Sequence, residues 1–358
     1  MPSELVRRPE LRWLVIPSLC FALGAGAVQA QEGLVEFDDL VEVSEVALDV
    51  LATDADGELV LGLGVDDFVV EEDGEPVAIT DVSFYTTRYE GAEGAPEIPW
   101  SRHLIFVFDD QSRLGRHGTD LLRQMIKVSA HSQRWVETEM GASDWVSVVR
   151  WDGRLQVYQD FTQDREALTA AIRRAAVGKK PEPVRASRTG FASLLRELPG
   201  RQERRGRETI YGALGRLAEA SGFIVGRKNL LLFTLGFGED DYSHPETWHD
   251  EEVYAPLETL LNDHNVAVYP IDVSPPGRAN HFSEALGQLA EDTGGEYHEN
   301  FIGFVNPMRD VAEENTGYYL VSYQSPRPAG EIGYQRLEVR AVDPAIEVHT
   351  RRGYRYGL

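Results

Sequence analysis

The chain has 358 residues, of which 42% are hydrophobic and 26% are charged, a composition typical of globular proteins. Its 59 acidic residues outnumber the 35 Lys and Arg residues. The resulting formal net charge of −24 argues against nucleic acid and anionic membrane surfaces as partners. Cys20 is the only cysteine, so no disulfide within the chain can stabilise the fold.

The first thirty residues have the pattern of a secretory signal peptide. Three arginines precede an apolar run from Leu14 to Val28, and the small-x-small sequence at 28–30 predicts cleavage before Gln31. An uncleaved anchor is the alternative, but the run falls short of the roughly 20 residues that span a bilayer. Cleavage leaves 32 basic and 57 acidic residues and no cysteine, which excludes thiol catalysis. We therefore expect a secreted or periplasmic protein with no membrane span after cleavage.

Residues 33–90 are predicted to form the strands of an N-terminal β half-domain. Apolar and polar side chains alternate there, first at Val41, Val43, Val46, Leu48 and Val50. The segments 54–57 (DADG) and 72–75 (EDGE) are typical hairpin turns, because glycine adopts the positive φ that such turns need. The first segment also suggests a calcium loop, but it lacks the distal bidentate Glu, so a plain turn is favoured.

A linker rich in Gly, Pro and Glu at 92–99 separates this half-domain from a different pattern, in which buried strands alternate with amphipathic helices. We predict strands at 103–108, 145–151, 155–161, 230–235 and 266–271, and helices at 121–136, 165–176, 209–220, 253–262 and 282–293. Over residues 100–315 this alternation predicts a Rossmann-like α/β fold, a doubly wound and mostly parallel sheet with helices on both faces.

After Gly317 the strand pattern returns. Its apolar positions are Tyr319, Val321, Tyr323, Leu337, Val339, Ala341, Ile346 and Val348. Neither terminal segment is long enough to bury a stable core of its own. We therefore predict that residues 317–358 pair with the N-terminal half in a smaller all-β sandwich, into which the α/β domain is inserted.

Ligands of doubly wound sheets bind beyond the carboxyl ends of the strands, so the loops at Asp109, Thr209, Leu235 and Asp272 indicate the candidate site. The sequence around them reads HLIFVFDDQS (103–112), DWVSVVRWDG (144–153), ETIYGAL (208–214), KNLLLFTLG (228–236), VAVYPIDVSPPG (266–277) and LAEDTGGEY (289–297). In this order the segments resemble von Willebrand factor type A (VWA) domains.

The resemblance extends beyond the α/β domain to the secreted bacterial VWFA-related group, found notably in acidobacteria. The segments that carry it are VDDFVVEEDGEPVAIT (65–80), TGYYLVSYQSP (316–326) and RLEVRAVDPAIEVHTRRGYR (336–355). It thus covers nearly the whole mature chain.

VWA domains typically hold Mg²⁺ at a metal-ion-dependent adhesion site, with ligands from Asp-x-Ser-x-Ser, a distant Thr and a second Asp. By resemblance, Asp109, Ser112 and Thr209 are the metal candidates here, although Ser112 stands one place out of register. Leu235 replaces the second acidic residue, and Arg113 adds a positive charge, so affinity for a divalent ion should fall. We interpret the site as degenerate, with no certain cofactor and with Mg²⁺ or Ca²⁺ as the ions to test.

Partner binding is the function that the resemblance implies. We predict a binding surface made of Asp109, Asp110, Ser112, Thr209 and Leu235. The chain is then an exported, non-enzymatic protein-binding module of the adhesion or assembly type, with an unknown protein as its partner.

The alternative is a hydrolytic or modifying enzyme of the cell envelope that uses an acidic loop. This loop contains Glu239, Asp240, Asp241, Glu246, Asp250, Glu251 and Glu252, and also His244 and His249. The mature sequence has no G-x-S-x-G, phosphate-binding loop, HExxH or cysteine nucleophile. Asp109 and Asp110 are neighbours on one strand end and should point apart. These features favour binding over catalysis.

Residues 173–207 form a basic insertion in an acidic protein. Eleven Lys or Arg residues face three Glu residues, a local net charge of +8. The segment is longer than normal connections, which favours either a functional or a mobile loop. Either it docks an anionic polymer or an acidic protein, or it merely balances the acidic surface. Within it, residues 191–198 are predicted to form a short helix.

Overall fold

The computed structural model describes residues 45–87, 97–110, 118–188, 192–198, 209–236, 254–275, 280–299, 305–325 and 332–356. The predicted signal peptide, the candidate residue Ser112 and the acidic loop at 239–252 lie outside these ranges. In the part of the chain that is described, no helix is long and apolar enough to cross a membrane.

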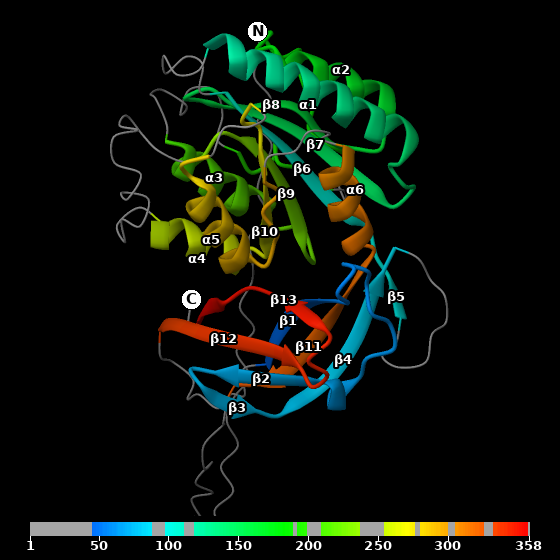
Figure 1. The fold of residues 1–358 in the computed structure, drawn as a ribbon, viewed down its shortest axis with the longest axis vertical. Helices are drawn as coiled ribbons and strands as arrows, with labels where there is room; N and C mark the ends of the chain where they lie inside the picture. Colours follow the sequence, from blue (N-terminus) through cyan, green and yellow to red (C-terminus); the bar gives the residue numbers. More distant parts are fainter. Residues whose placement is uncertain are drawn as a thin grey trace, which may run out of the picture. The chain divides into compact units, whose positions relative to one another are not determined.

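A five-stranded sheet forms the centre of the α/β domain (Figure 1). Its strands are β6 (Arg102–Asp109), β7 (Asp144–Trp151), β8 (Leu155–Thr162), β9 (Lys228–Thr234) and β10 (Val266–Asp272), in the order β10-β9-β6-β7-β8. All neighbouring pairs are parallel except β7 and β8. The carboxyl ends of the four parallel strands therefore meet at one edge, which we call the carboxyl edge.

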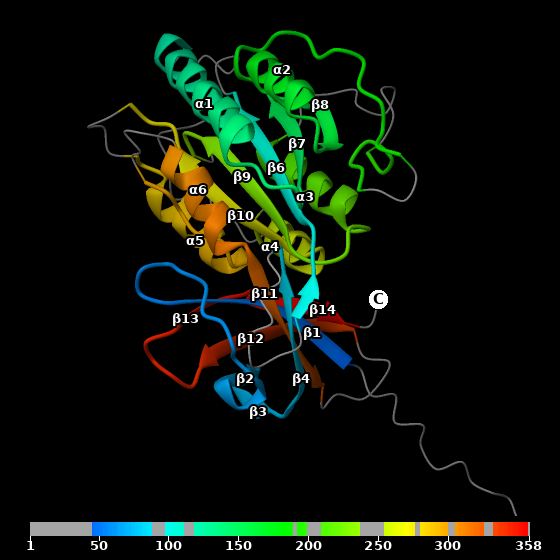
Figure 2. The ribbon, with the colours of Figure 1, turned by 90° about the vertical axis from the view of Figure 1, so that its right-hand side faces the viewer.

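Helices cover both faces of this sheet (Figure 2). They are α1 (Gly118–Thr138), α2 (Arg165–Ala176), α3 (Ile210–Ser221), α4 (Tyr254–Asp263), α5 (Ser283–Thr293) and α6 (Val305–Glu314). One core cluster joins the sheet to α3, α4 and α5, and the other joins it to α1, α2 and α6. The alternation of side chains along each buried strand explains this, since successive residues face opposite sides.

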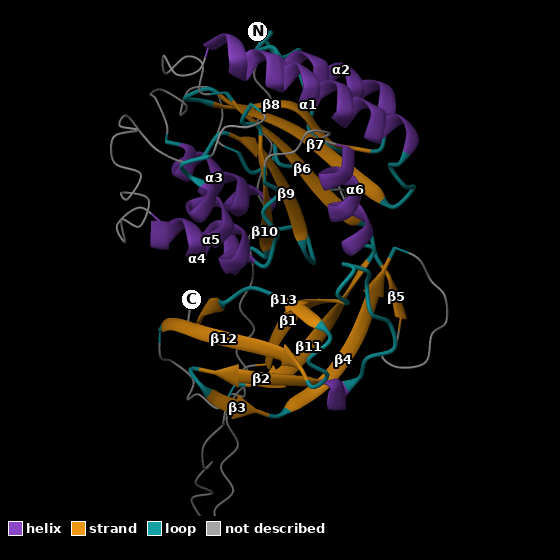
Figure 3. Ribbon diagram, viewed as in Figure 1, coloured by secondary structure: helices purple, strands orange, loops and turns teal. Residues whose placement is uncertain are grey.

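Strands from both ends of the chain form the other domain (Figure 3). They are β1 (Glu45–Thr53), β2 (Phe68–Glu72), β3 (Glu75–Val77), β4 (Ile79–Thr86), β5 (Glu97–Pro99), β11 (Gly317–Gln324), β12 (Gly333–Ala341), β13 (Glu347–His349) and β14 (Gly353–Tyr356). A short 3₁₀ helix spans Val65–Asp67. One sheet has the order β13-β1-β11-β4-β5 and the other β14-β12-β2-β3.

N-terminal and C-terminal strands are direct neighbours in both of these sheets. β1 pairs antiparallel with β11, and β2 pairs antiparallel with β12. Leu48, Phe84, Tyr319 and Leu337 belong to the core that the two sheets enclose. The predicted fold class, a doubly wound sheet with an all-β sandwich built from both termini, is thus confirmed. The domain bounds 33–90, 100–315 and 317–358 stay a prediction.

Some elements differ from the sequence-based expectation. Helix α6 and strands β5 and β14 were not predicted. The helix predicted at 191–198 is wrong for its described part, because residues 192–198 form turns. The 54–57 segment is the expected turn, and Asp54 accepts hydrogen bonds from the backbone N–H groups of Asp56 and Glu58. Its carboxylate thereby serves the turn itself.

Candidate functional site

Asp109 ends β6 in the middle of the carboxyl edge. Its side chain is fully buried, and its Oδ2 accepts a hydrogen bond of 2.5 Å from Thr234 Oγ1 at the end of β9. Thr234 Oγ1 also accepts from the backbone N–H of Gly236 at 2.9 Å. Gly236 has a φ of +124°, a conformation that L side chains rarely adopt. Asp109 is thus held by the neighbouring strand and its following turn.

Asp110 turns to the opposite face of the sheet and contacts a buried cation. Its carboxylate forms an ion pair with the guanidinium of Arg150, the last but one residue of β7. Arg150 Nε also lies 3.9 Å from Asp152 Oδ2. Only 3% of Arg150 is exposed. The two neighbouring aspartates therefore point apart, and a fixed positive charge lies beside the strand ends.

The position of Arg150 is enforced by the chain around it. Its guanidinium donates to the backbone carbonyl of Ala175, near the end of α2. Gly178 follows with a φ of +64°, and a Cβ atom there would lie 2.7 Å from an Arg150 nitrogen. Burial lowers the pKa of Arg150, and the negative charges of Asp152 and Asp109 oppose that shift. Since an arginine stays protonated in proteins, the site carries a permanent cation.

The end of β10 adds another carboxylate to this edge. Asp272 is fully buried, and its Oδ1 accepts from the backbone N–H of Ser274 at 2.7 Å. Leu235, which stands where the resemblance places an acidic residue, is 7% exposed and packs in the core on the α1 and α2 side. It presents no oxygen ligand.

Thr209 occupies the N-cap of α3. Its hydroxyl accepts from the backbone N–H of Gly212 at 2.9 Å, and its carbonyl accepts from Ala213. This is the standard geometry by which Ser and Thr satisfy the unpaired N–H groups of a helix start. The structure therefore gives Thr209 a structural role, whatever else its hydroxyl contacts.

The described residues do not by themselves assemble the metal site that the resemblance implies. Among the residues described, no group of three His, Cys, Asp or Glu side chains is arranged to hold a metal ion. Asp109 is bonded to Thr234, Asp110 is paired with Arg150, and Leu235 is apolar. A guanidinium among the carboxylates repels a divalent cation.

Arg150 is the residue that sequence reasoning missed. From the sequence we expected the added positive charge at Arg113, which lies outside the described residues. The signal was present, because an arginine in the strand VSVVRW interrupts a buried apolar run. A buried charge requires a partner, and Asp110 and Asp152 are close in sequence to strand ends of the same sheet.

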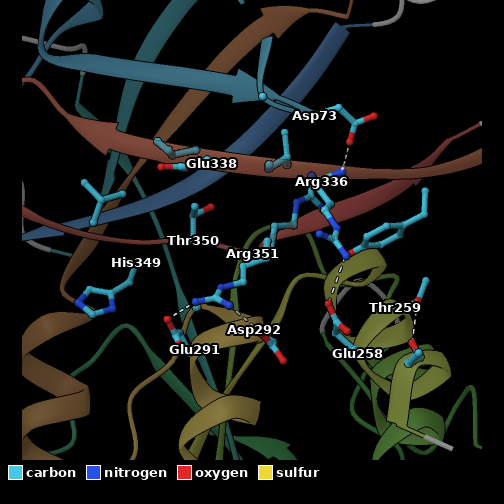
Figure 4. Close-up of a pocket in the computed structure, with 18 residues that line it drawn as sticks. Asp73, Glu258, Thr259, Glu291, Asp292, Arg336, Glu338, His349, Thr350 and Arg351 are labelled. Carbon is cyan, nitrogen blue, oxygen red and sulfur yellow. Dashed lines mark hydrogen bonds and ion pairs between the residues drawn. The ribbon is translucent and has the colours of Figure 1, made fainter. Parts of the chain in front are cut away.

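A second concave surface lies between α4 and α5 on one side and β12 and β13 on the other (Figure 4). This groove has a volume of about 1280 Å³. Arg352 forms ion pairs with Asp292, at 3.2 Å, and with Glu291. Tyr334 donates to Glu258 at 3.4 Å, and burial raises the pKa of this Glu. Opposite charges on the two walls thus pair with each other, which makes the groove a polar junction between helices and strands.

A pair of carboxyl groups lies at the end of α6. Burial, together with the charge and the hydrogen bond of Glu296, raises the pKa of Glu314 to about 9. Arg227, which is almost fully buried, opposes this shift. Burial and a neighbouring carboxyl group thus favour the neutral form of Glu314.

No protein-family model and no curated protein matches this chain. Solved structures that are similar include the von Willebrand factor type A from Catenulispora acidiphila, with 9% identity and a TM-score of 0.37 over 88% of this chain and 74% of that one. BatB from Bacteroides thetaiotaomicron shows 12% identity and a TM-score of 0.36, over 60% of this chain and 99% of that one.

Proximal thread matrix protein 1 from the mussel byssus, solved with a zinc-occupied MIDAS motif, is also similar. It has 15% identity and a TM-score of 0.36, over 63% of this chain and 48% of that one. The chain thus spans about half the length of the mussel protein. One of the three is a von Willebrand factor type A protein by name, and none is named as an acidobacterial protein. With TM-scores below 0.5, they carry no argument about function.

Proposed function

We propose that the chain is an exported, non-enzymatic protein-binding module that recognises its partner at the carboxyl edge without a divalent ion. The observation that supports this is Arg150, a buried cation that pairs with Asp110 and lies 3.9 Å from Asp152. This permanent positive charge compensates neighbouring carboxylates inside the fold, as a metal ion would in a complete adhesion site. In this proposal the degenerate site contains a built-in cation, the guanidinium of Arg150, in place of a bound metal ion.

The place of these residues favours binding to a partner. The carboxyl edge is where doubly wound sheets bind ligands, because loops from several strands converge there. Asp109, Thr234 and Asp272 are all fully buried, so they serve to shape the edge. Contacts to a partner then fall to the loops that these residues hold in place. Export is proposed from the sequence of residues 1–30.

The enzymatic alternative depends on the acidic loop at 239–252, which lies outside the described residues. The described carboxylates of the edge are engaged by Thr234, Arg150 and the backbone of Ser274. These contacts position the carboxylates structurally. They favour the binding function.

Calorimetry of residues 31–358 with Mg²⁺, Mn²⁺ and Ca²⁺ tests the built-in cation. We expect no binding at millimolar ion concentrations in the unaltered protein. Arg150→Gln removes the cation and leaves the carboxylates uncompensated, so this variant should gain affinity for Mn²⁺ or Ca²⁺. Arg102→Gln is the matched control, because Arg102 is equally buried and pairs with Asp144 at 2.8 Å at the opposite end of the sheet. It should gain none.

Tight binding of any of these ions by the unaltered protein, abolished by Asp109→Ala, would overturn the proposal. Circular dichroism of each variant must show that it folds. Where Arg150→Gln fails to fold, the unaltered protein alone still decides, because its own binding of an ion contradicts the built-in cation.

Photo-crosslinking in the source cells tests the binding surface. A photoreactive residue at Ser274, next to Asp272, should yield a protein adduct that persists in the presence of a chelator. The same residue at the exposed Glu338 in β12 is the control and should not yield that adduct. Loss of the adduct on chelation, or equal adducts from both positions, would contradict a metal-independent edge.

A further inference from the structure

The described part of the basic insertion lies along the edge of the central sheet. We define the basic strap as residues 177–188 and 192–198, which follow α2. β8 is the last strand on this side of the sheet, and Tyr158 of β8 donates to the carbonyl of Lys179 at 2.7 Å. Figure 2 shows the chain leaving α2 and descending past β8 before it reaches α3.

One buried carboxylate anchors the strap. Asp160 of β8 is 1% exposed and accepts three hydrogen bonds from the strap: from Ser187 N at 2.9 Å, Ser193 Oγ at 2.6 Å and Leu194 N at 2.8 Å. The side chain of Leu194 is fully buried in the core. The described strap is therefore held near both of its ends.

The hydrogen bonds to Asp160 do not neutralise the positive charge of the strap. All three donors to Asp160 are backbone N–H groups or a hydroxyl, so none of the strap's cations pairs with it. Lys179, Lys180, Arg185 and Arg188 are all exposed. No ion pair joins these four to an acidic residue within the described ranges. They form a row of cations on a chain whose formal net charge is −24.

Neighbouring contacts stiffen this row. Arg174 at the end of α2 pairs with Glu182 at 2.7 Å and donates to the carbonyl of Lys180. Arg196 donates to the carbonyls of Ser187 and Arg188 at 3.1 and 2.9 Å. Pro181 and Pro183 fix φ and lack an N–H, so the strap cannot offer a continuous ladder to an added strand. A row that is already ordered loses little entropy when it binds.

The chemistry of the row points to a polymer ligand. Hot spots of protein–protein interfaces are enriched in Trp, Tyr and Arg, usually around a desolvated centre. The described strap contains no Trp or Tyr, and Val177 is its only exposed large apolar side chain. A duplex nucleic acid has a high density of charge, which the acidic remainder of the protein repels. We propose that the basic strap binds a linear anionic polysaccharide along β8.

Binding assays on residues 31–358 with immobilised polysaccharides test this. Polygalacturonate carries carboxylates, heparin carries sulfates, and dextran is the neutral control. We expect binding to at least one of the anionic chains and none to dextran. Because ion release drives such binding, affinity should fall about tenfold or more between 50 and 200 mM salt. The preferred anion then identifies the substituent.

Two variants locate the site. Replacing Lys179, Lys180, Arg185 and Arg188 together by Gln should weaken binding about tenfold or more, with little effect on folding, since all four are exposed. The matched control replaces four exposed arginines outside the strap by Gln: Arg309, Arg336, Arg340 and Arg355. It should change affinity less than about twofold.

Several results would overturn the proposal. They are equal binding to dextran, full binding by the strap variant, or an equal loss in both variants. Tighter binding to polyglutamate would indicate an acidic protein as the ligand, and tighter binding to duplex DNA would indicate a nucleic acid, each against the proposal. None of these outcomes bears on the carboxyl edge, so the two proposals fail separately.

Discussion

The carboxyl edge and the basic strap handle buried charge in opposite ways. At the carboxyl edge, one buried cation, Arg150, lies among aspartates and pairs with Asp110. At the strap, one buried anion, Asp160 of β8, holds a basic segment and accepts hydrogen bonds only from neutral donors of that segment. At the carboxyl edge the buried charges pair with each other inside the fold. In the strap the cations are exposed to solvent.

This difference teaches where long-range electrostatics should matter. A carboxylate paired with a guanidinium contributes little net field, so recognition at the carboxyl edge depends on shape and on short-range contacts. Exposed lysines and arginines that lack internal partners act over a Debye length of about 8 Å at physiological salt. Salt should therefore affect ligand binding at the strap far more than partner binding at the edge.

The largest expected effect comes from removing the buried cation. Arg150→Met should lower the free energy of unfolding by about 3–5 kcal/mol, because it leaves Asp110 in a buried position without its ion pair. Denaturant titration measures this. Arg309→Met, which removes an exposed ion pair with Glu139, should cost about 1 kcal/mol or less. An equally small effect at Arg150 would show that the edge does not depend on its cation.

Removing the buried anion tests the other half of the comparison. Asp160→Asn replaces an acceptor oxygen by an NH₂ group that faces a donor, so it should cost about 1–3 kcal/mol. Trypsin should also cleave faster after Lys179 and Arg185, since the strap is released. Asp56→Asn on an exposed turn is the control. Unchanged cleavage would mean that Asp160 does not order the strap.

Thr234 tests whether the carboxyl edge also relies on neutral donors. Thr234→Val keeps the shape but removes the hydroxyl that donates to Asp109, and it should cost about 1–3 kcal/mol. Thr234→Ser retains the donor and should lose less. Equal losses in the two variants would assign the effect to packing rather than to the hydrogen bond.

Glu314 differs from both regions, because its raised pKa favours the neutral, protonated form of the carboxyl group. Its pKa of about 9 lies above that of an unfolded Glu, so its stabilising contribution is complete below about pH 4.5 and is lost as pH rises through 9. Between these values stability should fall by at most about 1.4 kcal/mol per pH unit. Thermal unfolding of Glu314→Gln should depend less on pH, whereas the exposed Glu313→Gln should resemble the unaltered protein.

The smallest effect is expected at the helix cap. Thr209→Ala should cost about 1 kcal/mol, because the N–H of Gly212 loses its acceptor, and Thr209→Ser should restore most of it. If Thr209→Ala instead abolished the adduct formed at Ser274 without changing stability, Thr209 would belong to the binding surface rather than to the scaffold.

The fold could be predicted where local patterns and packing agree. The predicted helix at 165–176 matches α2, since Asp164 caps it and apolar residues repeat at helical spacing. α6 was missed because Pro307 lies in a short segment with few apolar residues. The helix predicted at 191–198 does not form in its described part, because Ser193 and Leu194 bond to Asp160, which is distant in sequence.

The sequence predicts where Asp109 and Asp110 lie in the fold, but it does not predict which side chains they contact. Asp109 and Asp110 follow a buried strand, and their opposite directions follow from strand geometry. The partners Thr234 and Arg150 come from other strands, and the sequence alone does not reveal which charges meet. The same holds for Asp160, whose role depends on a segment about thirty residues further along the chain.

The side-by-side placement of β4 and β11 has a mechanical consequence. The end of β4 at Thr86 is paired with the start of β11 at Gly317, and the chain passes through β5 of the same sheet before it enters the α/β domain. A partner that pulls on the α/β domain therefore draws β5 and β11 along their length in the same direction. β11 is bonded to β1 from Gln324 to Tyr319, with hydrogen bonds perpendicular to the strands. Those bonds are loaded together in shear, so we expect the protein to resist tension applied through the α/β domain.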